Sequence, residues 1–210
     1  MFGLSLEARK NLTKKRGFMK KGFTIIEVSI LFVIFLIVAF LVAPLSLDDT
    51  RQAKNTSRWR NVQQDFSNIL YSANNEAKET SINFNEAFQS ILENEINEEI
   101  PRYKISYKNG AQPAGPYKFD NFKSTYSNAT IAIKFFDEPE KDLQGYLMYD
   151  VNGKNGPNTW GKDVFGLYIY KNYLEPFGKN ESLAQQKQDC SKNGTGLFCS
   201  NYYLIGGNFD

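Results

Sequence analysis

The stretch KKGFTIIEVSI, residues 20–30, leads into an uncharged apolar run and decides how this chain is organised. Residues 28–45 carry no charge, and as a helix that rises about 1.5 Å per residue they would cover about 27 Å, close to the hydrocarbon thickness of a bilayer. Basic residues precede the run and Asp48 and Asp49 follow it, which by the positive-inside rule keeps the N-terminus cytoplasmic. The sequence therefore predicts a single-pass helix in the inner (cytoplasmic) membrane at residues 23–47, with the rest of the chain exported.

Glu27 is the one charged residue near the apolar end of this helix. A carboxylate in apolar surroundings is costly unless a positive group compensates it, and the neighbouring helix positions offer no cation. The simpler alternative is an anchor helix with one badly placed acid near the membrane interface. The position of Glu27 thus predicts either a cationic partner or a local cost of insertion.

Residues 22–27, Gly-Phe-Thr-Ile-Ile-Glu, resemble the class III signal of type IV pilins and type II secretion pseudopilins, with a basic leader before them and an apolar run after them. The resemblance implies that a prepilin peptidase cleaves between Gly22 and Phe23 and that the new amine of Phe23 is N-methylated. Glu27 then takes the fifth mature position, where the family keeps a glutamate. Pro44 matches the proline that bends the family's N-terminal helix. The isoleucine-rich sequence around Glu27 departs from the family's commoner leucine-rich one.

The resemblance also implies a partner for Glu27. After cleavage the Phe23 amine lies about one helical turn away, and in a packed assembly the amine of a neighbouring subunit would also reach the carboxylate. Only one axial stagger between subunits neutralises the charges. The resemblance therefore implies that Glu27 sets the register of a filament that homologous subunits build through their N-terminal helices.

Residues 1–22 are the leader in this interpretation, and a start at Met19 would also leave a sufficient leader. The whole chain has 25 basic and 23 acidic residues. Subtracting the seven basic residues and the one acidic residue of the leader leaves 18 and 22, a net charge of −4 for the mature chain. This balance predicts no nucleic acid partner for the mature domain.

Residues 48–77 are predicted to continue the helix with a polar surface and one apolar stripe. The apolar positions follow one another at alternating steps of three and four residues. They are Trp59, Val62, Phe66, Ile69 and Ala73. A coiled-coil seam is less favoured, because only about three heptads are sustained. The stripe predicts an amphipathic helix that lies across a sheet.

Residues 78–101 are predicted to form a linker and a second, shorter helix. Asn83 followed by Glu86 resembles a capping box before an apolar run, so we expect a helix over residues 83–98 that ends before Pro101. Four glutamates gather near its end, at positions 93, 95, 98 and 99. We interpret them as a solvated face rather than as a catalytic pair.

Residues 102–210 are predicted to be an exported antiparallel β domain. Its most favoured strands are residues 103–107, 130–136, 145–149 and 164–170. Asn109-Gly110 after the first of these is a strong turn signal. The predicted fold class is α+β, with a long N-terminal helix, half membrane-spanning and half amphipathic, packed on three to five antiparallel strands. The resemblance adds that this fold is pilin-like.

The loop of residues 150–163 is rich in glycine and in side chains that carry oxygen. Calcium prefers six to eight hard oxygen ligands on a backbone that can curl around it. The side-chain candidates are Asp150, Asn152, Asn155, Asn158 and Asp163. Comparable loops occur in some pseudopilins, as the resemblance implies, although no glutamate closes this loop as in an EF-hand. The alternative is a turn whose side chains bond to their own backbone, and no other cofactor is expected.

Cys190 and Cys199 are the two cysteines of the chain. In an exported domain such a pair predicts one disulfide, here closing a short glycine-rich loop and contributing roughly 2–3 kcal/mol in the chain-entropy model. A C-terminal disulfide loop also agrees with the resemblance. Metal binding by two cysteines without histidine is poorly supported.

Catalytic patterns are not found in the sequence. The chain has no histidine, which removes the usual Ser–His, Cys–His and His–metal arrangements. Gly206-Gly207 follows no phosphate-binding pattern. We therefore expect that the protein is not an enzyme.

Two functional hypotheses remain. The first is a structural subunit of a type IV pilus or type II secretion pseudopilus. The mature chain of 188 residues favours a minor subunit. Its expected partners are homologous subunits, the prepilin peptidase and the inner membrane. The second is a monomeric, membrane-anchored extracytoplasmic binding or adhesin domain. Only the first needs cleavage at Gly22 and the charge of Glu27. The sequence does not separate pilus, secretion and DNA-uptake machines.

Overall fold

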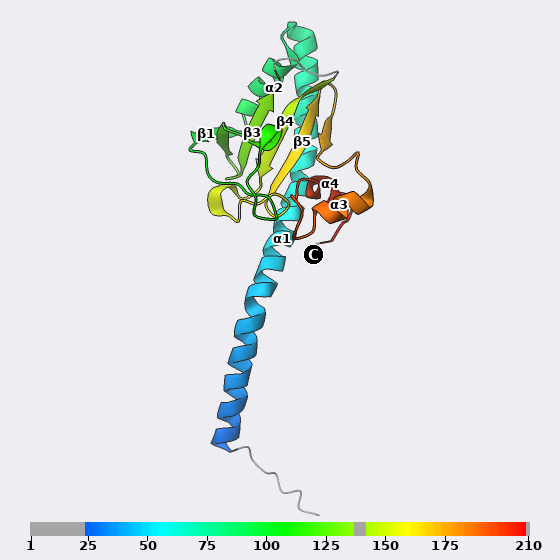
Figure 1. Cartoon of the computed structure of the whole chain (residues 1–210). Helices are drawn as coiled ribbons and strands as arrows, with labels where there is room; N and C mark the ends of the chain where they lie inside the picture. Colours follow the sequence, from blue (N-terminus) through cyan, green and yellow to red (C-terminus); the bar gives the residue numbers. More distant parts are fainter. Residues whose placement is uncertain (1–23, 137–141, 209–210) are drawn as a thin grey trace, which may run out of the picture. The chain divides into compact units, whose positions relative to one another are not determined.

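The structure is a computed structural model that describes residues 24–136 and 142–208, and only the backbone of residues 42–48 (Figure 1). The chain divides into two compact units, Met1–Leu45 and Ser46–Asp210, each of which is described by itself. The predicted cleavage site at Gly22 and Phe23 lies outside the described residues.

Helix α1 (Ile25–Thr80) is the longest element and contributes to both units. It begins directly after Thr24 and continues three residues beyond the predicted end at residue 77. Its backbone is helical at the position of Pro44, whose side chain is not among those described. The bend expected at Pro44 therefore stays a prediction.

No helix within residues 24–136 or 142–208 is both long and apolar enough to cross a membrane. Glu27 also lies among the apolar side chains at the start of α1, where a carboxylate lowers the tendency of the helix to enter lipid. This finding corrects two predictions. The prediction that the first half of the N-terminal helix spans the membrane, as part of a pilin-like fold, is wrong. The prediction of a single-pass location in the inner membrane is wrong for the same reason.

The part of α1 in the second unit packs through the apolar stripe on one face of the sheet. Trp59, Phe66 and Ala73 are buried there, and Val62 and Ile69 are half-buried against the same core. Leu70, which the stripe did not include, is also buried.

Helix α2 (Phe84–Glu93) ends five residues earlier than the sequence predicted. Asn83 is its N-cap, and the side-chain oxygen of Asn83 accepts a hydrogen bond from the backbone N–H of Asn85 at 2.8 Å. The chain then turns at Asn94 and enters strand β1 (Ile96–Ile100). Three of the four clustered glutamates therefore lie beyond α2, and two of them are exposed on an edge strand.

The sheet has six antiparallel strands that pair in chain order from β1 to β6. After β1, the strands are β2 (Phe122–Thr125), β3 (Thr130–Phe135), β4 (Leu143–Asp150), β5 (Val164–Tyr170) and β6 (Leu174–Pro176). The central strands β3, β4 and β5 coincide with predicted strands, whereas β1, β2 and β6 are additional. The strand predicted at residues 103–107 is wrong, since only Ser106 forms a bridge there, to Thr159.

Four short helical segments complete the described chain. They are the 3₁₀ turns η1 (Gly115–Tyr117) and η2 (Gly153–Asn155) and the helices α3 (Leu183–Asp189) and α4 (Cys199–Tyr202). Ser182 caps α3 through a complete capping box with Gln185.

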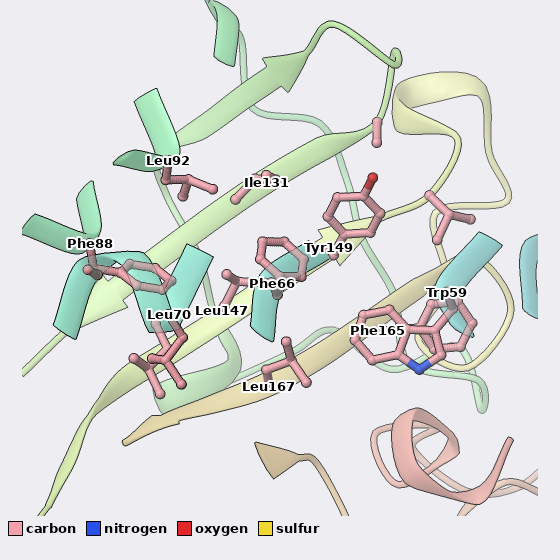
Figure 2. Close-up of a cluster of buried hydrophobic side chains, with 14 of the residues drawn as sticks. Trp59, Phe66, Leu70, Phe88, Leu92, Ile131, Leu147, Tyr149, Phe165 and Leu167 are labelled. Carbon is pink, nitrogen blue, oxygen red and sulfur yellow. The ribbon is translucent and has the colours of Figure 1, made fainter. Parts of the chain in front are cut away.

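Aromatic contacts join α1 to the sheet in the main core (Figure 2). The ring of Trp59 stacks on Phe165 of β5 with 5.0 Å between centroids, and Phe66 meets Tyr149 of β4 edge to face at 5.4 Å. A second core lies on the opposite face of the sheet, because successive strand residues point to opposite faces. It includes Ala132, Met148, Trp160, Val164 and Phe177.

We expect Trp59→Ala to lower the free energy of unfolding by about 3–5 kcal/mol, because it leaves a cavity and removes the aromatic contact. Urea denaturation of the full chain in mild detergent, followed by circular dichroism, measures this loss. Tyr71→Ala on the same helix is the matched control, since Tyr71 is 70% exposed, and should stay within about 0.5 kcal/mol of wild type. A loss below about 1 kcal/mol for Trp59→Ala would contradict the prediction.

Candidate functional site

The N-terminus of α1 is closed by a capping box between Thr24 and Glu27. The Glu27 Oε2 atom accepts hydrogen bonds from the Thr24 backbone N–H at 2.8 Å and from the Thr24 hydroxyl at 3.0 Å, while the Glu27 N–H donates to Thr24 Oγ1 at 3.3 Å. These hydrogen bonds hold the pKa of Glu27 below its usual value, so the carboxylate is ionised. The helix therefore offers Glu27 two hydrogen-bond donors, both from Thr24, but no cation. The sequence did not lead us to expect these donors. The signal was a threonine three positions before a glutamate.

Residues 25–41 of α1 present an apolar surface on all sides of the helix. Each large apolar side chain of this segment is at least 50% exposed, up to 86% for Ile25 and 82% for Phe40. Ser29 adds no free polar group, because its hydroxyl donates to the carbonyl oxygen of Ile25 at 2.8 Å. A helix that is apolar all round is normally covered, and exposed patches of this size mark interaction sites.

The loop between β4 and β5 brings together the two aspartates of the candidate calcium site. Asp150 and Asp163 are both fully buried. The Asp163 carboxylate accepts two backbone hydrogen bonds, from Asn158 at 2.9 Å and from Thr159 at 2.7 Å. The Asp150 carboxylate accepts one from the Tyr103 hydroxyl at 2.7 Å and one from the Asn152 N–H at 3.2 Å. All four carboxylate oxygens therefore have a protein donor.

Burial raises the pKa of both aspartates. The pKa of Asp150 rises to about 8, first because the carboxylate is desolvated and second because the charge of Asp163 lies nearby. The pKa of Asp163 is also raised by burial, and the backbone donors of Thr159 and Asn158 oppose that rise. At neutral pH the pair consequently keeps a proton on Asp150. Burial and the nearby Asp150 raise the pKa of Tyr103, so its hydroxyl stays protonated and remains a hydrogen-bond donor.

The three asparagines of the loop bond mainly to the loop's own backbone. Asn152 donates to the carbonyl oxygen of Gly156 at 3.0 Å, and Asn155 donates to the carbonyl oxygen of Asn152 at 3.2 Å. The side-chain oxygen of Asn158 accepts from the Gly156 N–H at 3.1 Å. This is the alternative that the sequence left open, a turn whose side chains bond to their own backbone.

The fit of this loop to calcium is incomplete. The buried side-chain oxygen of Asn152, Oδ1, has no hydrogen-bond partner. This oxygen is a possible calcium ligand in the same loop as the carboxylates of Asp150 and Asp163. Against this, no group of three or more Asp, Glu, Cys or His side chains within residues 24–136 and 142–208 is placed to hold a metal ion. A calcium ion would also have to compete with the hydrogen bonds of Asp150 and Asp163. Calcium binding at the predicted residues stays a prediction.

The predicted disulfide between Cys190 and Cys199 is confirmed. Both sulfurs lie in the main core. The loop is organised by Asp189, whose Oδ1 accepts from the N–H and hydroxyl of Thr195 at 2.8 and 2.6 Å and whose Oδ2 accepts from the N–H of Phe198 at 2.8 Å. Sequence reasoning missed Asp189. The available signal was an acidic residue directly before the first cysteine of a glycine-rich loop.

Comparison with protein-family models, with curated proteins and with solved structures gives no match for this chain. The function proposed below therefore relies on the residues and their geometry.

The raised pKa of Asp150 makes a specific pH dependence testable. Because the folded state holds a proton that the unfolded state releases above about pH 4, stability should fall as pH rises from about 4 to about 8, with a slope near 1.4 kcal/mol per pH unit for one proton. Asp150→Asn should flatten this slope, and Asp120→Asn, at an exposed carboxylate, should not. Urea titrations at several pH values, in buffer with a chelator, measure both. A slope that Asp150→Asn leaves unchanged would contradict the assignment.

Calcium should reverse that trend if the loop binds it. A cation that binds ionised Asp150 and Asp163 stabilises the folded state by mass action, so the melting temperature at pH 8 should rise on addition of calcium and fall again with chelator. Asp150→Asn should remove this response. If calorimetry detects no heat and the melting temperature does not move at millimolar calcium, the loop is a self-bonded turn.

Proposed function

We propose that this chain is a structural subunit, of the minor type, of a type IV pilus or type II secretion pseudopilus. In this proposal a prepilin peptidase cleaves after Gly22, Phe23 is N-methylated, and the subunit joins homologous subunits through residues 25–41. The observation that carries the proposal is the apolar surface of that segment, which is exposed all round the helix.

An apolar surface on every side of a helix calls for several neighbours rather than one. A single partner helix covers one stripe, as in a coiled coil, and leaves the rest in water. A bundle of equivalent helices covers each of them from all sides, and burial of apolar area at about 25 cal/mol per Å² favours it. This requirement supports assembly through many copies, with α1 in the interior of the filament.

The charge at the start of α1 supports the same proposal. Glu27 is ionised, and hydrogen bonds from Thr24 hold its carboxylate in place. Thr24 directly follows Phe23, the residue at which cleavage would create a new amine. Burying this carboxylate among apolar helices is costly unless an ammonium group enters with it. A filament in which each amine meets a Glu27 carboxylate satisfies that condition.

The alternative hypothesis, a monomeric membrane-anchored binding domain, depends on a membrane-spanning helix. Such a helix is not found in the part of the chain that the structure describes. We do not propose that function.

The charge of Glu27 can be tested separately from its capping role. We expect Glu27→Leu to be cleaved after Gly22 and folded as wild type, yet to enter filaments at least tenfold less well, because the amine of Phe23 loses its partner. Sheared filament fractions from a host with a working prepilin peptidase and filament machine, compared with cell fractions by immunoblot, measure incorporation.

Thr24→Val is the matched control, since it removes the capping hydroxyl but keeps the carboxylate. It should enter filaments nearly as well as wild type. Equal incorporation of Glu27→Leu and wild type, or an equal defect in Thr24→Val, would mean that the charge of Glu27 does not direct assembly. An uncleaved leader on the wild-type chain would contradict the proposed function itself.

A further inference from the structure

A groove of about 630 Å³ lies on the second unit between the segment after β1 and the loop that contains η1. We call it the 102–118 groove. Its first wall is formed by residues 102–105, and its second wall by lining residues between positions 112 and 118, in the loop that contains η1. The floor consists of apolar side chains that are nearly inaccessible, namely Ile105, Phe119, Phe122 and Met148.

The rim of this groove is positively charged. Arg102, Lys104 and Lys118 line it and are exposed, and no aspartate or glutamate is among its lining residues in the described chain. Arg102 is paired with Asp120 outside the groove at 2.7 Å, but both side chains are largely exposed, so the pair is weak and open to exchange. The groove thus offers three cations above an apolar floor.

The first wall, residues 102–105, has backbone groups without partners. Within the described residues, none of its N–H groups donates a backbone hydrogen bond and none of its carbonyl oxygens accepts one, whereas Ser106 bonds to both Asn158 and Trp160. Burial alternates along it, with Lys104 exposed and Ile105 buried, as expected for an extended chain. Four consecutive unpaired peptide units on an extended segment are a template for another strand.

We propose that the 102–118 groove binds an extended acidic peptide, which adds as a strand beside residues 102–105. Main-chain hydrogen bonds to the wall supply affinity, and alternate side chains of the peptide point to the apolar floor and to the cationic rim. Carboxylates of the peptide pair with Lys104, Lys118 and Arg102. This site is independent of the filament proposal, since no residue of the apolar helix contributes to it.

A peptide fits the groove better than a single-stranded nucleic acid. Nucleic acid binding of this kind needs aromatic faces on which bases stack. Phe119 and Phe122 are buried in the floor, and the two tyrosine rings at the groove already have partners: Tyr103 meets Phe122 edge to face at 4.9 Å, and Tyr117 stacks on Tyr146 at 5.8 Å. The free groups are instead peptide N–H and C=O groups at strand spacing.

The test uses the full chain in mild non-ionic detergent and a fluorescein-labelled peptide in which Glu-Val is repeated four times. Fluorescence anisotropy should show saturable binding that weakens with salt. Lys104→Glu combined with Lys118→Glu should weaken binding at least tenfold. Lys192→Glu, at an exposed lysine outside the groove, should leave it unchanged. Near-UV circular dichroism confirms that each variant is folded.

Two further probes separate strand addition from simple charge attraction. A peptide of the same sequence with alternate backbone nitrogens methylated keeps its charge but loses donors, and it should bind at least tenfold more weakly. An octanucleotide of deoxythymidine carries more negative charge than the peptide and should nevertheless compete poorly. The proposal is overturned if the methylated peptide binds as well as the parent, if the oligonucleotide binds as tightly, or if the acidic peptide does not bind.

Discussion

The contact between Trp59 and Phe165 is the interaction on which the second unit depends. Stacking alone would fix α1 on the sheet, but the buried indole N–H also needs an acceptor, which the carbonyl oxygen of Ser200 provides at 2.9 Å. The Ser200 hydroxyl in turn accepts from the N–H of Gly166 on β5 at 2.9 Å. Gly166 has no room for a side chain, because a Cβ there would lie 2.2 Å from the ring of Phe177. One tryptophan therefore binds the helix, the central strand and the C-terminal segment into a single core.

The buried carboxylates of the β4–β5 loop have a second consequence, because they hold the wall of the 102–118 groove. The Tyr103 hydroxyl donates to Asp150, and Ser106 exchanges backbone hydrogen bonds with Asn158 and Trp160 of the loop. The unpaired segment is thus fixed at both ends while its backbone between them is free. A segment held in this way loses little conformational entropy when a strand is added, which favours binding.

Helices and strands were predicted correctly where the hydrophobic periodicity of the local sequence is strong. The predictions failed where pairing with a distant strand determines the secondary structure. The apolar stripe that includes Trp59 and the three central strands follow from the periods of helix and strand. In residues 96–100, Ile96 and Ile100 continue the apolar positions of α2, yet pairing with β2 makes them a strand. Residues 103–107 alternate well but find no neighbouring strand. At the candidate sites, the residue types could be found in the sequence, but their hydrogen-bond partners could not be predicted. The hydroxyl donor to Asp150, for example, belongs to Tyr103, 47 positions away.

The start of α1 shows how capping and assembly can share one carboxylate. Both hydrogen bonds from Thr24 go to Glu27 Oε2, and among the described residues Oε1 accepts none, so an ammonium group could bind Oε1 without uncapping the helix. The apolar side chains around it supply affinity but little register, since neighbouring helices shifted by one turn, about 5.4 Å, bury nearly the same apolar area. Such a shift would leave the ionised carboxylate in apolar surroundings without a cation. In the proposed filament the apolar surface therefore drives association, and the single charge selects the stagger.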